Sequence, residues 1–189
     1  MPHKFDPGHV DRLESPERYE SMPPERTLRN LGLRRGMTFV DVGAGTGFFS
    51  LPAAQVVGST GRVYALDVEP AMLSSLTSKA PPPWLETMQC KESSLPLPPG
   101  TGDMVFTCFV LHETRDPLAF LRDMGRVAKP YAPVVILEWA KRRQKEGPPF
   151  GDRLHHHRVE ELVLEAGLCF KSVEFFNASQ YAVQAFKKR

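Results

Sequence analysis

The chain of 189 residues is 41% hydrophobic and 24% charged, which predicts one globular domain with a core large enough to fold unaided. The net charge of +2 is too small to favour nucleic acid as a partner, and no apolar run approaches the ~20 residues that span a bilayer. The N-terminus lacks an apolar signal core and the three cysteines are scattered, so we expect a cytoplasmic protein that does not act at a membrane.

The first 36 residues carry no strand pattern and are interrupted by prolines, which predicts an N-terminal helical cap over residues 1–36. Short helices are expected near residues 15–20 and 24–31, because Ser15 before Pro16 is a favourable pair for a helix start. We expect this cap to lie against the sheet edge, above a ligand pocket. Residues 37–189 form the rest of the same structural domain.

From residue 37 onward, strand and helix patterns alternate. Strands are predicted over residues 38–42, 62–66, 85–90, 103–109 and 134–138, and helices over residues 48–57, 70–79, 117–129 and 158–166. This alternation indicates an α/β fold with a doubly wound parallel sheet and right-handed crossovers. Two further strands, at 168–176 and 181–187, are joined by a link of four residues and must therefore be antiparallel.

Three glycines at alternate positions, Gly43, Gly45 and Gly47, follow the first strand and precede an apolar helical segment. Glycines at such a turn permit positive φ angles and let a ligand approach the backbone, and the helix end adds unpaired N–H groups. A dinucleotide fingerprint would need glycine at position 48, where the chain has Phe48. The spacing therefore predicts a nucleotide-like ligand and disfavours a dinucleotide.

Two acidic residues accompany this loop. Asp41 lies just before it, and Asp67 ends the next strand, about 20 residues past the last glycine, where an acid can hold ribose hydroxyls. Residues 41–47 together with Asp67 resemble the cofactor site of class I S-adenosylmethionine-dependent methyltransferases, in particular the small ubiquinone/menaquinone C-methyltransferase-like group. The resemblance runs from about residue 35 to the C-terminus. It implies a Rossmann-like, seven-stranded, mostly parallel sheet of order 3-2-1-4-5-7-6 with strand seven antiparallel.

The same resemblance implies S-adenosyl-L-methionine as cofactor and S-adenosyl-L-homocysteine as product. The cap of some 36 residues and a short insert around residues 141–152 leave room for a modest, small-molecule methyl acceptor, while a protein or RNA substrate stays open. The resemblance places the glycine loop at the methionine part, Asp41 at the ammonium group and Asp67 at the ribose. The residues assigned to the cofactor are Asp41, Gly43, Ala44, Gly45, Gly47, Asp67, Val68, Met72, Glu92, Ser93, Thr107, Cys108 and Phe109. From the residues alone, alternatives stay open: Asp41 as a helix-capping carboxylate, Asp67 as a solvated acid, and Val68 and Met72 as ordinary core.

One departure from the family pattern follows the third predicted strand. Many relatives have Gly-Asp-Ala there, with the aspartate near the adenine amino group, whereas this chain has Cys90, Lys91 and Glu92. Lysine cannot accept a hydrogen bond, so we expect Glu92 to take over this contact. The alternative is an exposed Lys-Glu pair in a turn.

Methyl transfer requires alignment of donor and acceptor, and it requires a base only where the acceptor must lose a proton. His112, just past the fourth strand, is the best-placed candidate because an imidazole titrates near neutral pH. Glu138, which ends the fifth strand, could bind or deprotonate the acceptor, and Trp139 could wall the pocket. The alternatives are a packing histidine and a carboxylate paired with Lys141 or Arg142.

The three histidines at 155–157 predict no metal site, because consecutive helical residues do not share a face and no other ligand lies at suitable spacing. A helix start or a substrate-facing loop is expected there. Two other functions stay open: a non-catalytic S-adenosylmethionine-binding module and, disfavoured by Phe48, an NAD-dependent oxidoreductase. The sequence predicts neither the acceptor nor the oligomeric state.

Overall fold

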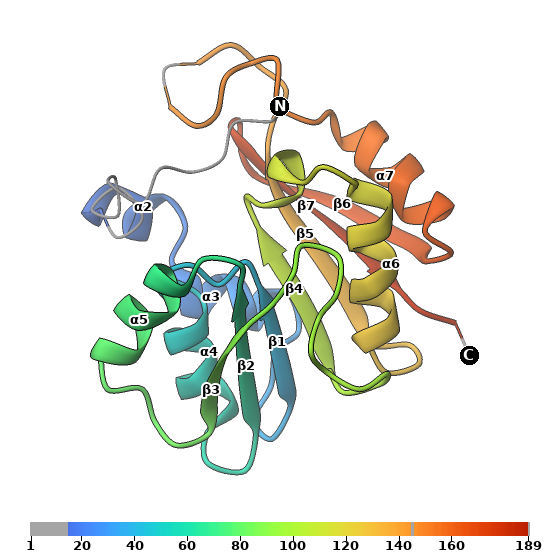
Figure 1. Ribbon diagram of the computed structural model, residues 1–189. Coiled ribbons are helices and arrows are strands. Elements are labelled where there is room, and N and C mark those ends of the chain that lie inside the picture. Colours follow the sequence, from blue (N-terminus) through green and yellow to red (C-terminus); the bar gives the residue numbers. More distant parts are fainter. Residues whose placement is uncertain (1–14, 145, 189) are drawn as a thin grey trace.

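The computed structural model describes residues 15–144 and 146–188, in which seven strands form one sheet of order β3-β2-β1-β4-β5-β7-β6 (Figure 1). The parallel strands are β1 (Thr38–Val42), β2 (Arg62–Asp67), β3 (Leu85–Gln89), β4 (Met104–Cys108) and β5 (Pro133–Trp139). At one side of the sheet, β7 (Gln180–Phe186) runs antiparallel to β5, and β6 (Cys169–Asn177) runs antiparallel to β7. The predicted strand order and directions are confirmed.

Helices cover both faces of this sheet (Figure 1). One face carries α3 (Pro24–Asn30), α4 (Ser50–Val57) and α5 (Pro70–Ser78), and the other carries α6 (Pro117–Val127) and α7 (His156–Glu165). Successive residues of β1 enter opposite cores: Phe39 packs with the α3 and α4 side, and Val40 with the α6 and α7 side. Side chains of a strand alternate between faces, so a sheet covered on both sides needs apolar residues at consecutive positions.

The N-terminal helices α2 (Pro16–Ser21) and α3 follow the predicted positions closely. The Ser15 hydroxyl accepts a hydrogen bond from the backbone N–H of Arg18 (3.3 Å), as the predicted N-cap requires. Leu28 of α3 is fully buried against α4 and the sheet, so this part of the cap shares the main core. Residues 1–14 of the predicted cap lie outside the described residues.

Two local features differ from the sequence expectation or were not foreseen. The helix expected from residue 48 begins at Ser50, because Phe48 and Phe49 are buried in the turn that ends the glycine loop. After α6, Tyr131 adopts φ +63° with its side chain 61% exposed, a conformation that favours glycine. Across the described part of the chain, every helix is too short or too polar to cross a bilayer.

Candidate functional site

The glycine loop and the end of β2 are joined at the carboxyl edge of the sheet, where open α/β sheets bind their ligands. The backbone N–H of Gly45 donates to Asp67 Oδ2 (2.8 Å), and the N–H of Glu69 donates to Asp67 Oδ1 (2.9 Å). Burial raises the pKa of Asp67 above its ordinary value, while these backbone hydrogen bonds oppose the rise. The carboxylate is thereby held beside the loop, where the predicted ribose contact needs it.

The loop itself tolerates only glycine at two of its positions. Gly43 has φ +75°, and a Cβ there would lie 2.3 Å from Val110 Cγ2. Gly47 has φ +92°, and its Cβ would lie 2.3 Å from Leu76 Cδ1. The backbone therefore passes so close to Val110, just past the end of β4, and to Leu76 of α5 that a side chain at either glycine would displace it. The alternation of glycines thus reflects packing as well as access for a ligand.

Asp41 is buried beneath the loop, where Ser50 Oγ donates to its Oδ2 (2.5 Å). Burial raises the pKa of Asp41 to about 7; the Ser50 hydrogen bond lowers it, the Asp67 charge raises it and the Arg18 charge lowers it. Ionisation of this buried carboxyl group is costly without a nearby cation, and a cation bound beside it would favour the ionised form. This is the property that the predicted ammonium contact requires.

Arg18 is a site residue that the sequence patterns did not indicate. Its guanidinium carbon lies 4.0 Å from the Phe48 ring centroid and 5.7 Å from that of Phe109. Its charge also acts on Asp41, which places a cation and an acid together at one end of the site. No local pattern marks Arg18, because it lies in a segment without strand periodicity and reaches the loop only through the packing of α2.

This pair of opposite charges fits the amino-acid end of S-adenosylmethionine. A zwitterionic methionine group carries an ammonium and a carboxylate, which match Asp41 and Arg18 respectively. A ribose diol matches the acceptor oxygens of Asp67. The charges and acceptor oxygens at this edge are therefore compatible with the amino-acid and ribose parts of the cofactor that the sequence resemblance implies.

The predicted adenine side lies where β2 and β3 end next to each other, with Asp67 paired to Gln89 in the parallel register. Val68 is 36% exposed, whereas Met72 on α5 is only 5% exposed. An exposed valine at a strand end suits contact with a flat ligand, and it argues against the alternative of an ordinary core position for Val68. Met72 is compatible with both assignments.

Glu92 has a structural partner that the sequence did not predict. Its Oε1 accepts hydrogen bonds from the backbone N–H groups of Arg115 (2.5 Å) and Asp116 (3.3 Å), just before α6. The carboxylate therefore fixes the turn after β4. Glu92 and Ser93 are both half-buried, and their predicted contact with adenine would use the oxygens that remain.

Three consecutive residues, 107–109, lie at the end of β4 and just beyond it, and the last of them has a strained backbone. Thr107 is fully buried and its Oγ1 donates to the Val42 carbonyl (2.8 Å), so its side chain ties β4 to β1. Burial raises the pKa of the Cys108 thiol, and the Arg18 guanidinium opposes this rise. Phe109 has φ +61°, a conformation that costs about 1–2 kcal/mol for a residue with a Cβ. Its ring stacks on Trp139 at a centroid distance of 4.6 Å.

His112 and Glu138 were predicted as separate candidates, and the structure brings them into one buried pair. His112 Nδ1 lies 2.8 Å from Glu138 Oε2, and the His112 backbone N–H donates to Glu138 Oε1 (3.1 Å). Glu138 is completely buried, and it does not pair with Lys141 or Arg142. The pairing arises because β4 and β5 are neighbours, which sequence separation alone does not reveal.

The pair has the electrostatics of a general base. Burial lowers the pKa of His112, but the charge of Glu138 and its hydrogen bond outweigh burial, so the pKa lies above its ordinary value. Since a carboxylate only accepts, Nδ1 carries a proton and Nε2 keeps the lone pair in the neutral ring. Nε2 lies 3.8 Å from Glu113 Oε1, and the charge of Asp152 also raises the His112 pKa.

The segment between β5 and α7 contacts Trp139, the residue that follows Glu138. Arg153 is 2% exposed and donates to the carbonyls of Pro148 (2.8 Å), Arg142 (3.0 Å) and Glu146. Gly147 lies against the Trp139 indole, and a Cβ at this position would lie 2.7 Å from Cδ2 of the ring. A buried arginine that binds three carbonyls ties the described parts of this segment together next to Trp139.

The histidines at 155–157 lie together, contrary to the geometry expected for consecutive helical residues. Their ring centroids are 4.2–5.2 Å apart, and one nitrogen from each lies within 4.8 Å of the others. His155 is the N-cap of α7 with an extended backbone, so the three side chains do not fan out around a helix. The predicted helix start is confirmed, two residues earlier than expected.

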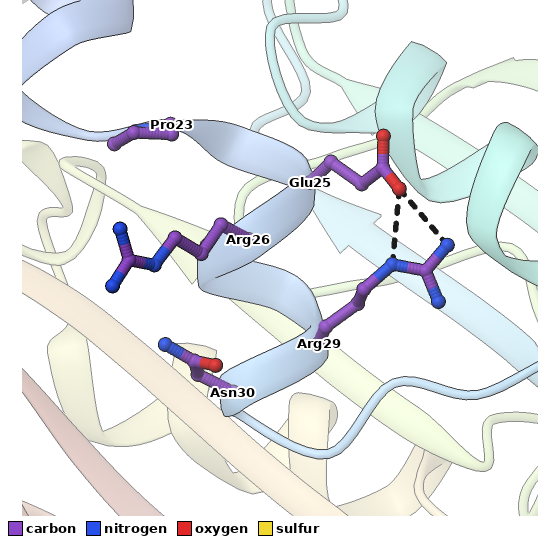
Figure 2. A pocket seen from close by; sticks show the side chains of 5 residues that line it. All are labelled: Pro23, Glu25, Arg26, Arg29 and Asn30. Carbon is purple, nitrogen blue, oxygen red and sulfur yellow. Dashed lines mark hydrogen bonds and ion pairs between the residues drawn. The ribbon is translucent and has the colours of Figure 1, made fainter.

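A hollow of about 370 Å³ lies on the surface of α3 (Figure 2). It is lined by Pro23, Glu25, Arg26, Arg29 and Asn30, and Glu25 pairs with Arg29 at 2.9 Å. None of these residues belongs to the glycine loop or to a strand end. This hollow is therefore separate from the candidate site.

Comparison with known proteins agrees with the fold and with the class of cofactor. A family model described as a methyltransferase domain matches residues 40–136, which include the glycine loop, Asp67 and His112. A solved structure of an S-adenosylmethionine-dependent methyltransferase from Aquifex aeolicus is 35% identical with a TM-score of 0.91, and the match covers 96% of this chain and 98% of that one.

Two curated relatives match a shorter part of the chain. The ubiquinone/menaquinone biosynthesis C-methyltransferase UbiE of Enterobacter sp. (strain 638) is 34% identical, over 61% of this chain and 47% of its own. The demethylmenaquinone methyltransferase of Bacillus licheniformis is 34% identical, over 60% of this chain and 50% of its own. The matched part thus spans about half the length of these relatives.

Proposed function

This chain belongs to the methyltransferase-domain family of class I S-adenosylmethionine-dependent methyltransferases, and we propose that it methylates a small molecule, with His112 as the base. The observation that carries the proposal is the buried pair of His112 and Glu138, at the same sheet edge as the glycine loop. A buried histidine whose Nδ1–H is oriented by Glu138, and whose Nε2 carries the lone pair of the neutral ring, is suited to accept a proton from a bound acceptor.

Residues of five segments would hold the cofactor. Asp41 would bind the ammonium group of the cofactor, Arg18 its carboxylate and Asp67 its ribose hydroxyls. The glycine loop would lie against the methionine part of the cofactor. Val68 and Met72 would pack on the adenine, and Glu92 and Ser93 would lie at its polar edge. The carbonyls at residues 107–109 would face the methionine part.

S-adenosylmethionine supplies a methyl carbon that is already electrophilic because it is bonded to a sulfonium. The chain therefore has to align the acceptor and exclude water. In the proposed reaction His112 Nε2 would take the proton that the acceptor loses, so that the acceptor could receive the methyl group and S-adenosylhomocysteine would be left as the product. Glu138 is a positioning residue, because it holds the imidazole and favours its protonated form.

The acceptor is proposed to be small and flat. The stacked rings of Phe109 and Trp139 offer an aromatic wall beside the pair, and the segment fixed by Arg153 limits the space. The relatives named for quinone biosynthesis support an activated aromatic ring as the acceptor class. Free cysteines at positions 90, 108 and 169 support a reducing, cytoplasmic setting.

Calorimetric titration with S-adenosylhomocysteine and, separately, with NAD tests the cofactor. S-adenosylhomocysteine should bind and NAD should not, and Arg18→Gln should weaken binding by about tenfold or more, since a charged hydrogen bond is worth roughly 1.5–3 kcal/mol. Binding of NAD alone would show an oxidoreductase and overturn the proposal.

A panel of small aromatic acceptors with methyl-labelled cofactor tests the chemistry. His112→Asn should lower turnover by about a hundredfold or more without changing S-adenosylhomocysteine affinity. Glu138→Gln should shift the pH–rate inflection to lower pH, because the carboxylate charge raises the His112 pKa. Tyr181→Phe is the matched control, since it removes a hydroxyl near Glu138 that bonds only the Leu154 carbonyl (2.9 Å). Full activity of His112→Asn would remove the base role.

The second candidate function is a non-catalytic S-adenosylmethionine-binding module. It is supported by the fact that the cofactor residues and the catalytic pair are separate sets of side chains. Tight S-adenosylhomocysteine binding without methyl transfer to any acceptor class would favour it.

A further inference from the structure

A cavity of about 310 Å³ lies between the end of β5, the hairpin of β6 and β7, and the start of α7. Its polar lining comes from Lys141, Arg142, His155 and His156, and its apolar lining from Phe175, Tyr181 and two alanines. No acidic residue lines it. The cavity therefore combines positive charge with an aromatic wall.

The two cations are directed by backbone carbonyls instead of carboxylates. Lys141 Nζ donates to the Gly151 carbonyl (3.1 Å), and an Arg142 Nη donates to the Ala178 carbonyl (3.0 Å). Within residues 15–144 and 146–188, neither forms an ion pair, so their charges are not neutralised by the described residues. Each also keeps further N–H donors for a ligand.

The imidazoles add donors on the other side of the cavity. The His156 ring lies 5.4 Å from the Phe175 ring and 6.0 Å from the Tyr181 ring, so it forms part of the aromatic wall. Burial lowers the pKa of His156, and the charges of His155 and His157 lower it further. The lowered pKa keeps the His156 ring neutral at pH 7, and a neutral imidazole still has one N–H to donate to an anion.

Phe175 gives the cavity an apolar contact surface that the fold leaves uncovered. Its side chain is 52% exposed on β6, although Tyr181 beside it is fully buried. A large exposed aromatic side chain next to cations without an ion pair does not stabilise the fold, and such exposed apolar surface often marks a binding site. This combination suits a ligand with an anionic end and a flat body.

We propose that this cavity binds a small molecule that carries a carboxylate or phosphate group on an aromatic body. Arg142 and Lys141 pair with the anion, His155 and His156 donate to it, and Phe175 packs on the ring. The site is distinct from the cofactor site and does not depend on methyl transfer.

A metal ion is the competing occupant, because three imidazoles gather at this place. Two features favour the anion. Lys141 and Arg142 would repel a divalent cation at the same cavity. In addition, His155 Nδ1 already accepts a hydrogen bond from the His157 backbone N–H (3.4 Å), which leaves it one nitrogen.

Calorimetry at low ionic strength with EDTA tests the proposal, using phenyl phosphate, benzoate, inorganic phosphate and phenol as probes. Phenyl phosphate and benzoate should both bind, and the tighter of the two shows whether the site prefers a phosphate or a carboxylate group. Inorganic phosphate and phenol should bind at least tenfold more weakly, because inorganic phosphate lacks the aromatic ring and phenol lacks the anionic group. Arg142→Gln should weaken phenyl phosphate at least tenfold, in line with the loss of a charged hydrogen bond.

Arg143→Gln is the matched control in the same segment, because its guanidinium lies over the Phe150 ring (5.1 Å) and does not line the cavity. It should leave the affinity unchanged. Phe175→Ala changes an exposed side chain and provides a second variant should Arg142→Gln fold poorly; it should weaken phenyl phosphate but not inorganic phosphate. Equal binding by wild type and both variants would overturn the proposal. So would tight Zn²⁺ binding, measured without EDTA and lost in His156→Asn, with no binding of either aromatic anion.

Discussion

Replacing Asp41 by asparagine should make the protein more stable and less able to bind its cofactor. Asparagine keeps the size of the side chain and can still accept the hydrogen bond from Ser50. What it removes is a carboxylate that burial makes costly to ionise. The substitution therefore separates the stability of the fold from the electrostatics of the site.

The magnitude follows from the pKa of Asp41, which rises from 3.8 to about 7 on folding. At 1.36 kcal/mol per pH unit this interval corresponds to about 4 kcal/mol. Because the folded pKa is the higher one, the native state binds the proton more strongly, and stability from this group is lost as pH rises from about 4 to about 7. Between pH 5 and pH 8 the wild type should lose roughly 2.5 kcal/mol relative to Asp41→Asn.

Urea unfolding of both proteins at pH 5 and pH 8, followed by tryptophan fluorescence, measures this difference. Titration of other groups cancels in the comparison between the two proteins. Asp116→Asn is the control, because Asp116 is an exposed N-cap of α6 and asparagine caps a helix equally well. A wild-type-to-variant gap that is the same at both pH values would refute the buried-carboxylate reasoning.

The same carboxylate should couple cofactor binding to proton release. An ammonium group beside Asp41 favours its ionised form, so binding of S-adenosylhomocysteine near pH 6 should expel a proton. Calorimetric titration in two buffers of different ionisation enthalpy measures this proton, and Asp41→Asn should abolish it. Identical binding enthalpies in both buffers for the wild type would contradict the assignment of Asp41 to the ammonium group.

Three further changes test the architecture around the site by urea unfolding. Gly147→Ala should cost about 1–3 kcal/mol and alter the fluorescence of Trp139, because its Cβ would lie 2.7 Å from the indole and its φ is +81°. Arg153→Met should cost about 3 kcal/mol, since three carbonyls lose a donor that is itself buried, and trypsin should then cut the segment between β5 and α7 faster. Tyr131→Gly should stabilise by up to about 1 kcal/mol, because relief of its positive φ exceeds the entropy cost of glycine; a loss of stability there would show that the exposed ring packs usefully.

Local patterns carried most of the fold prediction for a physical reason. The central strands of a parallel sheet covered on both faces are rich in apolar residues, and proline or glycine marks several helix ends, as at Pro70, Pro117 and Gly58. Such elements can be located from neighbours along the chain. β1 was predicted at its observed bounds on this basis. Where packing decides the boundary, the pattern was less accurate: Phe48 and Phe49 are apolar enough for a helix but are buried in the turn before it.

The sequence by itself determined the class of cofactor and predicted its main anchors, because Asp41, the glycine loop and Asp67 belong to one βαβ unit that places β1 and β2 side by side. Only the tertiary structure decided which residues from distant segments complete the site. Arg18 reaches the loop through the packing of α2, and His112 meets Glu138 because β4 lies beside β5. The histidines at 155–157 share one place because the chain turns at His155 into α7. These contacts depend on how elements pack in space, and no spacing along the chain encodes that.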